Sequence, residues 1–314
     1  MRILLTGAAG HTARALLPAL LQHPSQPRIL AVDIRSPDLH HPHLESRTAD
    51  LRFLPWMELL EKVDTVIHLA FIVLSPGLGP EKRWRAEMAA VNRQGTLRLL
   101  RAAARAGVRQ FLYGSSVSVY GAWPDNPLGM EESHPLRPVP GFAYGEDKTA
   151  VERCMDALEV LHPQIALCRL RLHAIVGPDA QPLVNQIATS PWSLRLPNPA
   201  LPIQCVHQDD AVSAFLGAWE QEASGIFNIA ADSPVPWSAI PRKWQIPLSP
   251  GQVHHLHRVI RPLTRILGDP GWLPGLQYPL IVDTRRAKIH LGWKARYSVA
   301  EAIESVRERS SRDR

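Results

Sequence analysis

Cysteine is scarce in this chain of 314 residues, which contains only Cys154, Cys168 and Cys205. Their number is odd and no two have the CxxC spacing, which argues against a disulfide framework and against a structural zinc site. We therefore expect the protein to work in a reducing compartment without a bound metal ion.

Long hydrophobic runs are also missing. The N-terminal MRILLTGAAG lacks the extended apolar segment of a signal peptide. The most apolar later stretch, VDTVIHLAFIVL, is too short to span a bilayer and contains Asp64 and His68. We expect a soluble, cytoplasmic protein that does not bind a membrane.

Lysine is rare, and only six of the 35 basic residues are Lys. The net charge of +6 and the pI of about 9.5 would suit nucleic acid or another anion. However, the arginines are scattered, and no basic tract is interleaved with aromatic residues. We therefore expect a small-molecule substrate and no nucleic acid. The sequence leaves open whether the protein forms a homodimer.

The first half of the chain alternates apolar β-rich runs with helical stretches. This pattern predicts a parallel sheet with helices on both faces, an α/β fold of the Rossmann type. The predicted strands are RILLTG, RILAVD, DTVIHLA, RQFLYGSS and QIALCRLR, and the predicted helices are TARALLPALLQ, 81–106 and AYGEDKTAVERCMDALEVL.

The pattern changes after Gly177-Pro178, where prolines become frequent. We predict a dinucleotide-binding domain over 1–176 and a smaller substrate-binding cap over 177–314, with about 204–231 returning to the first domain. Regular elements in this half are predicted at DDAVSAFLGAWE, GIFNIA, HRVIRPLTRIL and SVAEAIESVRER.

A glycine-rich turn, TGAAGHTA, joins the first strand to the first helix. Gly7 and Gly10 allow a tight turn and close approach to a pyrophosphate, while the helix N-terminus offers free N–H groups. The second strand ends in Asp33, whose carboxylate can accept hydrogen bonds from ribose hydroxyls. That charge would repel the 2′-phosphate of NADP, although Arg35 offsets it in part. The turn therefore predicts NAD, with NADP less favoured.

YGEDK places Tyr144 and Lys148 one helical turn apart on one face. Hydride transfer at a carbinol carbon needs an acid or base for the hydroxyl proton, and tyrosine is poorly matched to neutral pH. A nearby ammonium would lower the tyrosine pKa. YGSSVSVYG supplies Ser115 and Ser116 at the end of a strand, where ligands bind in open α/β sheets. These groups together predict hydride-transfer chemistry.

Over nearly its whole length the chain resembles an extended short-chain dehydrogenase/reductase of the NAD-dependent epimerase/dehydratase type. The matching motifs are TGAAGHTA, AVD at 31–33, AD before Leu51, HLA at 68–70, VNRQGT at 91–96, YGSSVSVYG, YGEDK, VGP at 176–178, VHQDDA at 206–211 and DTRRAKIHLGW at 283–293. Together these motifs are highly specific.

The resemblance implies a role for each matching residue. It implies that Ser116 orients the substrate, that Tyr144 is the acid/base, and that Lys148 binds the nicotinamide ribose and tunes Tyr144. The implied cofactor-binding residues are Gly7, Gly10, His11 and Thr12 for pyrophosphate, Asp33 for ribose, Asp50 and Leu51 for adenine, and Leu69, Ala70, Phe71, Leu172 and His173 around the rest of the cofactor, with Asn92 supporting the architecture of the site. We add Arg35, which follows Asp33, and Ser115, which ends a strand, to the cofactor-binding set.

Departures from the family pattern bear on the substrate. Nucleotide-sugar enzymes of the family often carry an Asn where this chain has Ala174, and an Arg where it has Ile203. Sugar dehydratases place an acid pair where Val117 and Ser118 stand. The departures therefore disfavour a nucleotide-sugar diphosphate and argue against dehydration.

The predicted function is reversible, NAD-linked hydride transfer at a secondary alcohol or ketone. A nucleotide-sugar 4-epimerase is the first alternative, and a dinucleotide-binding regulatory or assembly protein without catalysis is the second. The histidines in HHPH at 40–43 and HHLH at 254–257 are interpreted as solvated loop residues. Trp237, Trp244 and Trp272 would either line an apolar substrate pocket or fill the core of the cap, and we favour the core.

Overall fold

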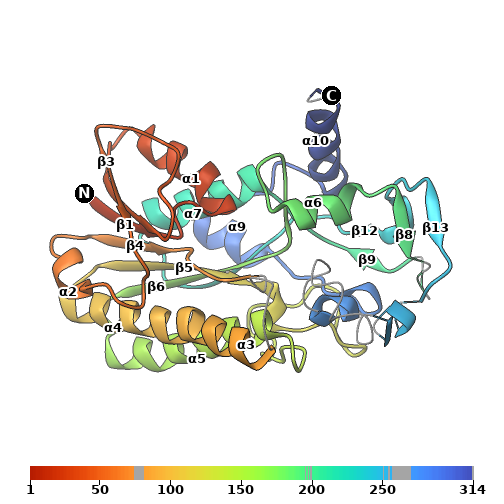
Figure 1. The fold of residues 1–314 in the computed structure, drawn as a ribbon, viewed down its shortest axis with the longest axis horizontal. Helices are drawn as coiled ribbons and strands as arrows, with labels where there is room; N and C mark the ends of the chain where they lie inside the picture. The colour runs from red at the N-terminus through yellow and green to blue at the C-terminus, as the bar shows by residue number, and fades with distance from the viewer. Residues whose placement is uncertain are drawn as a thin grey trace.

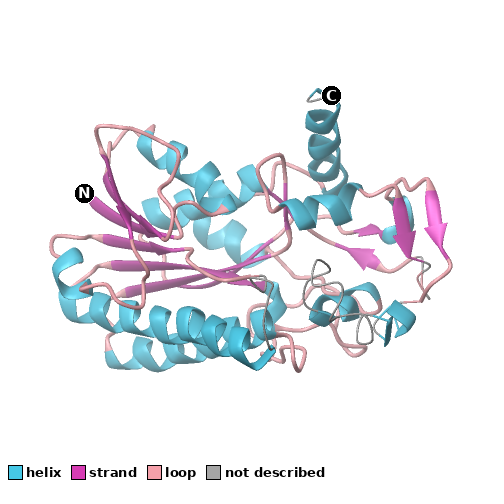
Figure 2. Cartoon of the chain, viewed as in Figure 1, coloured by secondary structure: helices cyan, strands magenta, loops and turns pink. Residues whose placement is uncertain are grey.

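The structure is a computed structural model that describes residues 1–73, 81–194, 196, 198, 200–249, 251–253, 255–256 and 270–312 (Figures 1 and 2). The helix predicted at HRVIRPLTRIL lies outside these residues, as do His254 and His257 of the second histidine-rich patch. Among the described residues, every helix is too short or too polar to pass through a lipid bilayer.

A seven-stranded parallel sheet forms the centre of the protein, in the order β11-β6-β5-β4-β1-β2-β3. The predicted Rossmann-type fold is therefore confirmed. The strand order reverses between β1 and β4, where ligands bind in open α/β sheets. The strands are β1 (Arg2–Thr6), β2 (Arg28–Asp33), β3 (Leu44–Thr48), β4 (Thr65–His68), β5 (Gln110–Ser116), β6 (Ala166–Leu172) and β11 (Gly225–Ile229).

Helices cover both faces of this sheet, and apolar side chains fill the two layers between them (Figure 1). One face carries α1 (His11–Leu21), α7 (Gln208–Glu220) and α9 (Arg285–Leu291). The opposite face carries α2 (Trp56–Leu59), α3 (Glu81–Ala89), α4 (Thr96–Ala106) and α5 (Ala143–Leu161). Because both faces are covered, the central strands are buried along almost their whole length.

The helix predicted over 81–106 contains a π-helical segment, Ala90–Gly95, between α3 and α4. Gly95 lies against Leu51, and a Cβ at Gly95 would come within 2.0 Å of Leu51 Cδ1. Asn92, fully buried in the same segment, hydrogen-bonds to both backbone groups of Ile72 and to Asp147 on α5. The π-helical segment thereby links the chain after β4 to α5.

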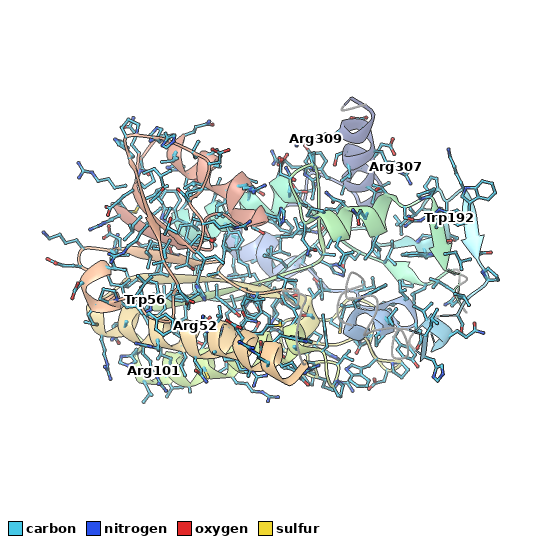
Figure 3. All side chains as sticks on the ribbon, viewed as in Figure 1. Arg52, Trp56, Arg101, Trp192, Arg307 and Arg309 are labelled. Atoms are coloured by element: carbon cyan, nitrogen blue, oxygen red, sulfur yellow. The ribbon has the colours of Figure 1, made fainter. Side chains whose placement is uncertain are left out.

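The cap lies beyond the carboxyl ends of the strands and is built from short elements (Figure 2). Trp192 lies at its far end, away from the sheet (Figure 3). The cap's own apolar cluster includes Val176, Ile240 and Ile303. The elements beyond the strand ends are β7 (Ile175–Val176), α6 (Pro182–Thr189), β8 (Trp192–Leu194), β9 (Pro202–Ile203), β10 (Val206–His207), β12 (Val235–Pro236), η3 (Trp237–Ala239), β13 (Trp244–Ile246), η5 (Pro270–Leu276) and α10 (Val299–Arg312). A further 3-10 turn, η2 (Val117–Val119), directly follows β5.

A buried ion pair joins β6 to α5 beside the strand ends. Arg171 donates to Glu152 through Nε, at 3.1 Å from both carboxylate oxygens, and through Nη2 at 2.5 Å. The Glu152 carboxylate also accepts from Ser115 at 2.5 Å, and Arg171 Nη1 donates to the Tyr120 hydroxyl at 2.6 Å. Tyr120 in turn donates to Asn228 at 2.8 Å. One polar network therefore links β5 through Ser115, β6 through Arg171, β11 through Asn228 and α5 through Glu152.

Removing the charge from this network is expected to destabilise the fold strongly. Glu152→Gln would leave the Arg171 guanidinium buried without a counter-charge, so we expect a loss of about 3–5 kcal/mol in the free energy of unfolding, measured by chemical denaturation. Glu61→Gln removes an exposed partner of Lys62 and is the control, with an expected loss of about 1 kcal/mol or less. Equal losses in the two variants would contradict this account of the network.

Candidate functional site

The glycine turn after β1 has the geometry of a pyrophosphate cradle. Gly7 has φ of +73°, and a Cβ there would lie 2.5 Å from the backbone nitrogen of Ala70. Gly10 precedes α1, and no side chain caps this end of the helix or places an acidic group in its first turn. The free N–H groups of the first turn and the positive end of the helix dipole therefore suit an anion.

Asp33 ends β2 next to this turn, as the sequence predicted. Its carboxylate accepts hydrogen bonds from the backbone N–H of Ala9 at 3.0 Å and of Arg35 at 3.1 Å. These two contacts fix the carboxylate beside the turn and leave acceptor positions for ribose hydroxyls. The residues present thus fit a dinucleotide at this edge of the sheet.

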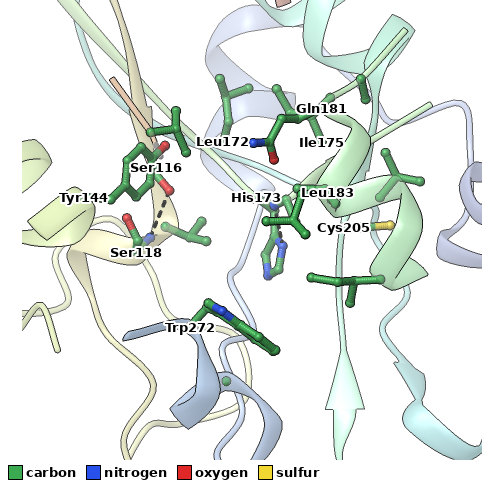
Figure 4. A pocket seen from close by; sticks show the side chains of 18 of the residues that line it. Ser116, Ser118, Tyr144, Leu172, His173, Ile175, Gln181, Leu183, Cys205 and Trp272 are labelled. Carbon is green, nitrogen blue, oxygen red and sulfur yellow. Dashed lines mark hydrogen bonds between the residues drawn. The ribbon is translucent and has the colours of Figure 1, made fainter. Parts of the chain in front are cut away.

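A cavity of about 730 Å³ runs from this turn into the cap. In Figure 4, Ser116, Ser118 and Tyr144 lie on one side of it, Leu183 and Cys205 on the other, and His173 between them. The cap side is mainly apolar. Three cationic side chains, Arg35, Lys148 and Arg242, line the cavity, and among the described residues no Asp or Glu does.

Ser116 and Tyr144 face the cavity from β5 and from the first turn of α5. The Ser116 hydroxyl accepts from the backbone N–H of Ser118 at 3.2 Å, and the Tyr144 side chain lies on the same side of the cavity. Burial raises the pKa of Tyr144, and the hydrogen bond from Ser116 offsets only part of this rise. Tyr144 is therefore held as the neutral phenol at neutral pH, and the expectation of a lowered tyrosine pKa was wrong for this arrangement.

Lys148 lies one turn along α5, buried, with its ammonium donating to the Gly114 carbonyl at 2.6 Å. The ammonium sits 3.6 Å from the ring centre of Phe71 and 5.7 Å from that of Tyr144. Burial lowers the pKa of Lys148 to about 7, although Glu152 and Asp147 act in the opposite direction. Because Lys148 is directed to Gly114 and Phe71 and is close to half charged at pH 7, it does not dominate the pKa of Tyr144.

His173 lines the cavity but has no free nitrogen. Its Nδ1 accepts from the backbone N–H of Ala174 at 2.8 Å, so Nε2 carries the proton and donates to the Leu280 carbonyl at 2.9 Å. Burial lowers the pKa of His173 to about 4, so the ring is neutral at physiological pH. The ring therefore anchors the chain near Leu280 and presents a packing surface to the cavity.

The structure brings most of the predicted site residues to this cavity. Its walls include Gly7, Gly10, His11, Thr12, Arg35, Leu69, Phe71, Ser115, Ser116, Tyr144, Lys148, Leu172 and His173. Asp33, Asp50, Leu51, Ala70 and Asn92 do not line it. Asp50 is held by the guanidinium of Arg52 at 2.6 Å, and its contact with adenine stays a prediction. The described residues hold no cluster of three or more His, Cys, Asp or Glu side chains arranged for a metal ion.

Cap residues also line the cavity. Trp237 and Trp272 pack against an apolar cluster of the cap, as the favoured interpretation expected, and line the cavity as well, whereas Trp244 is exposed and stacks on Trp192. Arg242 also lines the cavity. No local motif marks these positions. They reach the cavity because short strands pair over long distances, as β12 does with β9.

Comparison with known proteins decides the family. The sequence model of the NAD dependent epimerase/dehydratase family matches residues 3–230. The chain belongs to this family. Its members are NAD-dependent enzymes, so the protein is an enzyme and its cofactor is NAD, as the sequence predicted.

Individual relatives cover the chain to different extents. An uncharacterised protein of Mycobacterium tuberculosis is 28% identical over 96% of this chain and 82% of its own length. A 3 beta-hydroxysteroid dehydrogenase/Delta 5-->4-isomerase of the same organism is 31% identical over 60% of this chain and 51% of its own length. The solved structure of MoeE5 in complex with UDP-glucose and NAD has a TM-score of 0.71 and 25% identity, covering all of this chain and 99% of that one.

The cofactor cradle can be tested with two glycines of the same backbone conformation. Gly7 and Gly107 have φ of +73° and +74°, but a Cβ at Gly107 meets no atom within 4 Å. Gly107→Ala should therefore cost only the backbone strain of roughly 1–2 kcal/mol and leave NAD affinity unchanged. Gly7→Ala should cost more, because its Cβ meets the backbone at Ala70, and should abolish NAD binding in calorimetric titration. Normal NAD affinity in Gly7→Ala would contradict this.

The buried ammonium of Lys148 should make stability depend on pH. Its pKa is about 7 in the folded protein, against the ordinary 10.5, so between these values the unfolded chain binds a proton that the folded chain has lost. The free energy of unfolding therefore rises with pH between about 7 and 10.5. Below about pH 7 the folded protein carries the full cost of burying a charged ammonium, and above that pH this cost decreases as the folded-state lysine loses its proton.

We expect the free energy of unfolding of the wild type to increase, relative to Lys148→Met, as pH rises from about 7 to about 9.5. Denaturant titrations at several pH values measure this difference. Lys62→Met, which removes an exposed lysine, is the control. A wild-type-to-Lys148→Met difference that does not change with pH would show that the site does not hold the lysine as described.

Proposed function

We propose that the protein catalyses reversible hydride transfer between NAD and a secondary alcohol or ketone with a predominantly apolar body. The observation that carries this proposal is that Ser116, Tyr144 and Lys148 line one side of a cavity whose opposite, cap side is apolar. A pocket with mostly apolar walls and a few convergent polar groups is the usual form of a small-molecule site.

The protein residues would divide the chemistry between binding and proton transfer. Bound NAD supplies the carbon that accepts or donates hydride. The glycine turn and the N-terminus of α1 would hold its pyrophosphate, and Asp33 its adenosine ribose. Ser116 would hydrogen-bond the substrate oxygen and orient it towards Tyr144, and Lys148 would bind the ribose nearest the reacting carbon.

Tyr144 would donate its phenolic proton to the oxygen of a ketone, or accept the proton of an alcohol in the reverse direction. Burial raises its pKa, so the protonated, acid form predominates at neutral pH. The reductive direction is therefore favoured at neutral pH, and oxidation should accelerate as pH rises towards the pKa of the phenol.

The cap side of the cavity favours an apolar substrate. Ala174 and Ile203, which stand where nucleotide-sugar enzymes of the family often carry polar ligands, both line the cavity. Leu183, Ile187 and Trp237 extend the same apolar wall. The likeness to the 3 beta-hydroxysteroid dehydrogenase supports the same substrate class, because a hydroxysteroid is an apolar secondary alcohol.

A nucleotide-sugar 4-epimerase is the second candidate. It is favoured by the likeness in fold to MoeE5, which was solved with UDP-glucose and NAD. Each missing charged hydrogen bond at positions 174 and 203 should weaken diphosphate binding by roughly 1.5–3 kcal/mol. An epimerase would also retain NAD through its cycle, so NAD that remains bound through purification would favour this candidate.

The role of Tyr144 is tested by removing only its hydroxyl. Tyr144→Phe should lose several orders of magnitude in turnover for apolar ketones while NAD affinity stays unchanged, because the hydroxyl is needed for proton transfer and not for the fold. Tyr297→Phe, which removes a phenolic hydroxyl from the tyrosine stacked on His207, is the control. Turnover within tenfold of the wild type in Tyr144→Phe would rule out the assignment.

A further inference from the structure

Two aromatic rings lie against the buried ammonium of Lys148. Its Nζ is 3.6 Å from the ring centre of Phe71, which follows β4, and 4.6 Å from that of Tyr113 on β5. The Tyr144 ring is farther away, at 5.7 Å. Among the described residues, the Gly114 carbonyl is the only group that accepts a hydrogen bond from this ammonium. Ring faces therefore stand where a buried lysine usually has a carboxylate partner.

The carboxylates nearest to Lys148 are already bound to arginines. Glu152 accepts hydrogen bonds from Arg171 through both of its oxygens, and Asp147 is paired with Arg93. Both carboxylates raise the pKa of Lys148, but burial acts more strongly in the opposite direction. The charge of the ammonium is therefore only partly balanced by its acidic neighbours on α5.

The titratable groups on the neighbouring strands bring no negative charge to the ammonium. His68 on β4 is fully buried, and burial together with the charge of Lys148 lowers its pKa to about 3. Burial raises the pKa of the Tyr113 and Tyr144 phenols, so both are neutral at physiological pH. The ammonium thus meets neutral groups on its strand side, and aromatic faces are its closest contacts after the Gly114 carbonyl.

The backbone beside Phe71 is fastened to the helix that carries Lys148. Ile72 donates its N–H to the Asn92 side chain at 2.8 Å, and its carbonyl accepts from the same side chain at 3.1 Å. Asn92 Nδ2 also donates to Asp147 on α5 at 2.9 Å. These hydrogen bonds fix the position of the Phe71 ring relative to α5, so the ring stays over the ammonium.

We propose that Phe71 is a positioning residue whose ring stabilises the charged form of Lys148 and keeps its ammonium at the cavity wall. The face of an aromatic ring is negative and attracts a cation, most strongly where water is excluded. The same ring meets the Tyr144 ring edge-on, with centres 5.5 Å apart. Where it concerns NAD, the proposal rests on the proposed function, because a charged ammonium is the stronger donor to ribose.

The first experiment measures the pKa of Lys148 by nuclear magnetic resonance. The chain contains only six lysines, so the Cε resonances of protein with isotope-labelled lysine are few, and the one lost in Lys148→Met identifies Lys148. Phe71→Leu should lower the pKa obtained from its titration by roughly one pH unit, as expected for the loss of a desolvated cation–π contact. Phe71→Tyr keeps the ring and should leave this pKa close to that of the wild type.

Phe142→Leu is the matched control. Phe142 lines the same cavity and packs against Tyr144, with ring centres 5.8 Å apart, but the rings over the Lys148 ammonium are those of Phe71, Tyr113 and Tyr144. Its loss should leave the titration of Lys148 unchanged. If Phe71→Leu fails to fold, a pentafluorinated phenylalanine at position 71 keeps the ring shape, removes its negative face and should lower the pKa in the same way. An unchanged Lys148 titration in the folded variant overturns the proposal.

Calorimetric titration with NAD separates this contact from the role of Lys148 in the proposed function. If the charged ammonium binds ribose, Phe71→Leu should match the wild-type affinity within about twofold at about pH 5 and bind NAD roughly tenfold more weakly at about pH 8. Equal losses at both pH values, with the Lys148 titration unchanged, are the result of a ring that only fills space and overturn the proposal. A lowered Lys148 pKa without any change in NAD affinity would support the contact and refute ribose binding by Lys148.

Discussion

The buried ion pair between Arg171 and Glu152 is the constraint on which the geometry of the site depends. It fastens α5 to β6, and through the hydroxyl of Ser115 it also fastens β5. Tyr144 and Lys148 are on the same helix, and Ser116 follows Ser115 on the same strand. Asn92 and Asp147 add a second tie, from α5 to the chain after β4. Satisfied buried networks of this kind rigidify their surroundings, so Ser116, Tyr144 and Lys148 are held in place before any ligand arrives.

Polar side chains with different proposed roles lie at different positions along the cavity. The proposed anion-binding groups lie at the glycine turn, the proposed proton-transfer groups Ser116 and Tyr144 lie at the end of β5 and the start of α5, and an apolar wall extends from there into the cap. Burial acts on each titratable group in this setting by disfavouring its charged form, which raises the pKa of Tyr144 and lowers those of Lys148 and His173. Burial therefore reduces the charge around Ser116, Tyr144 and Lys148, and Arg242 lines the same cavity from the cap.

Local patterns in the sequence were sufficient to predict the strands of the sheet centre and to pick out residues that the fold gathers at one cavity on the sheet side. Continuous apolar runs marked β1, β2, β4, β5 and β6, and the spacing of Tyr144 and Lys148 marked the reacting face of α5. The edge strand β3 was missed because LESRT is polar and mostly exposed, so its pairing with β2 has no apolar signature. The cap wall was missed because its two- and three-residue strands are defined by partners far along the chain.

Isotope transfer tests the central claim most directly. The protein is incubated with NAD and an apolar secondary alcohol that carries deuterium on the carbinol carbon, and the cofactor is analysed by mass spectrometry. The account predicts that deuterium appears in the reduced cofactor and that the corresponding ketone accumulates. It would be contradicted if no apolar alcohol transferred its label while UDP-galactose was converted to UDP-glucose by the same preparation.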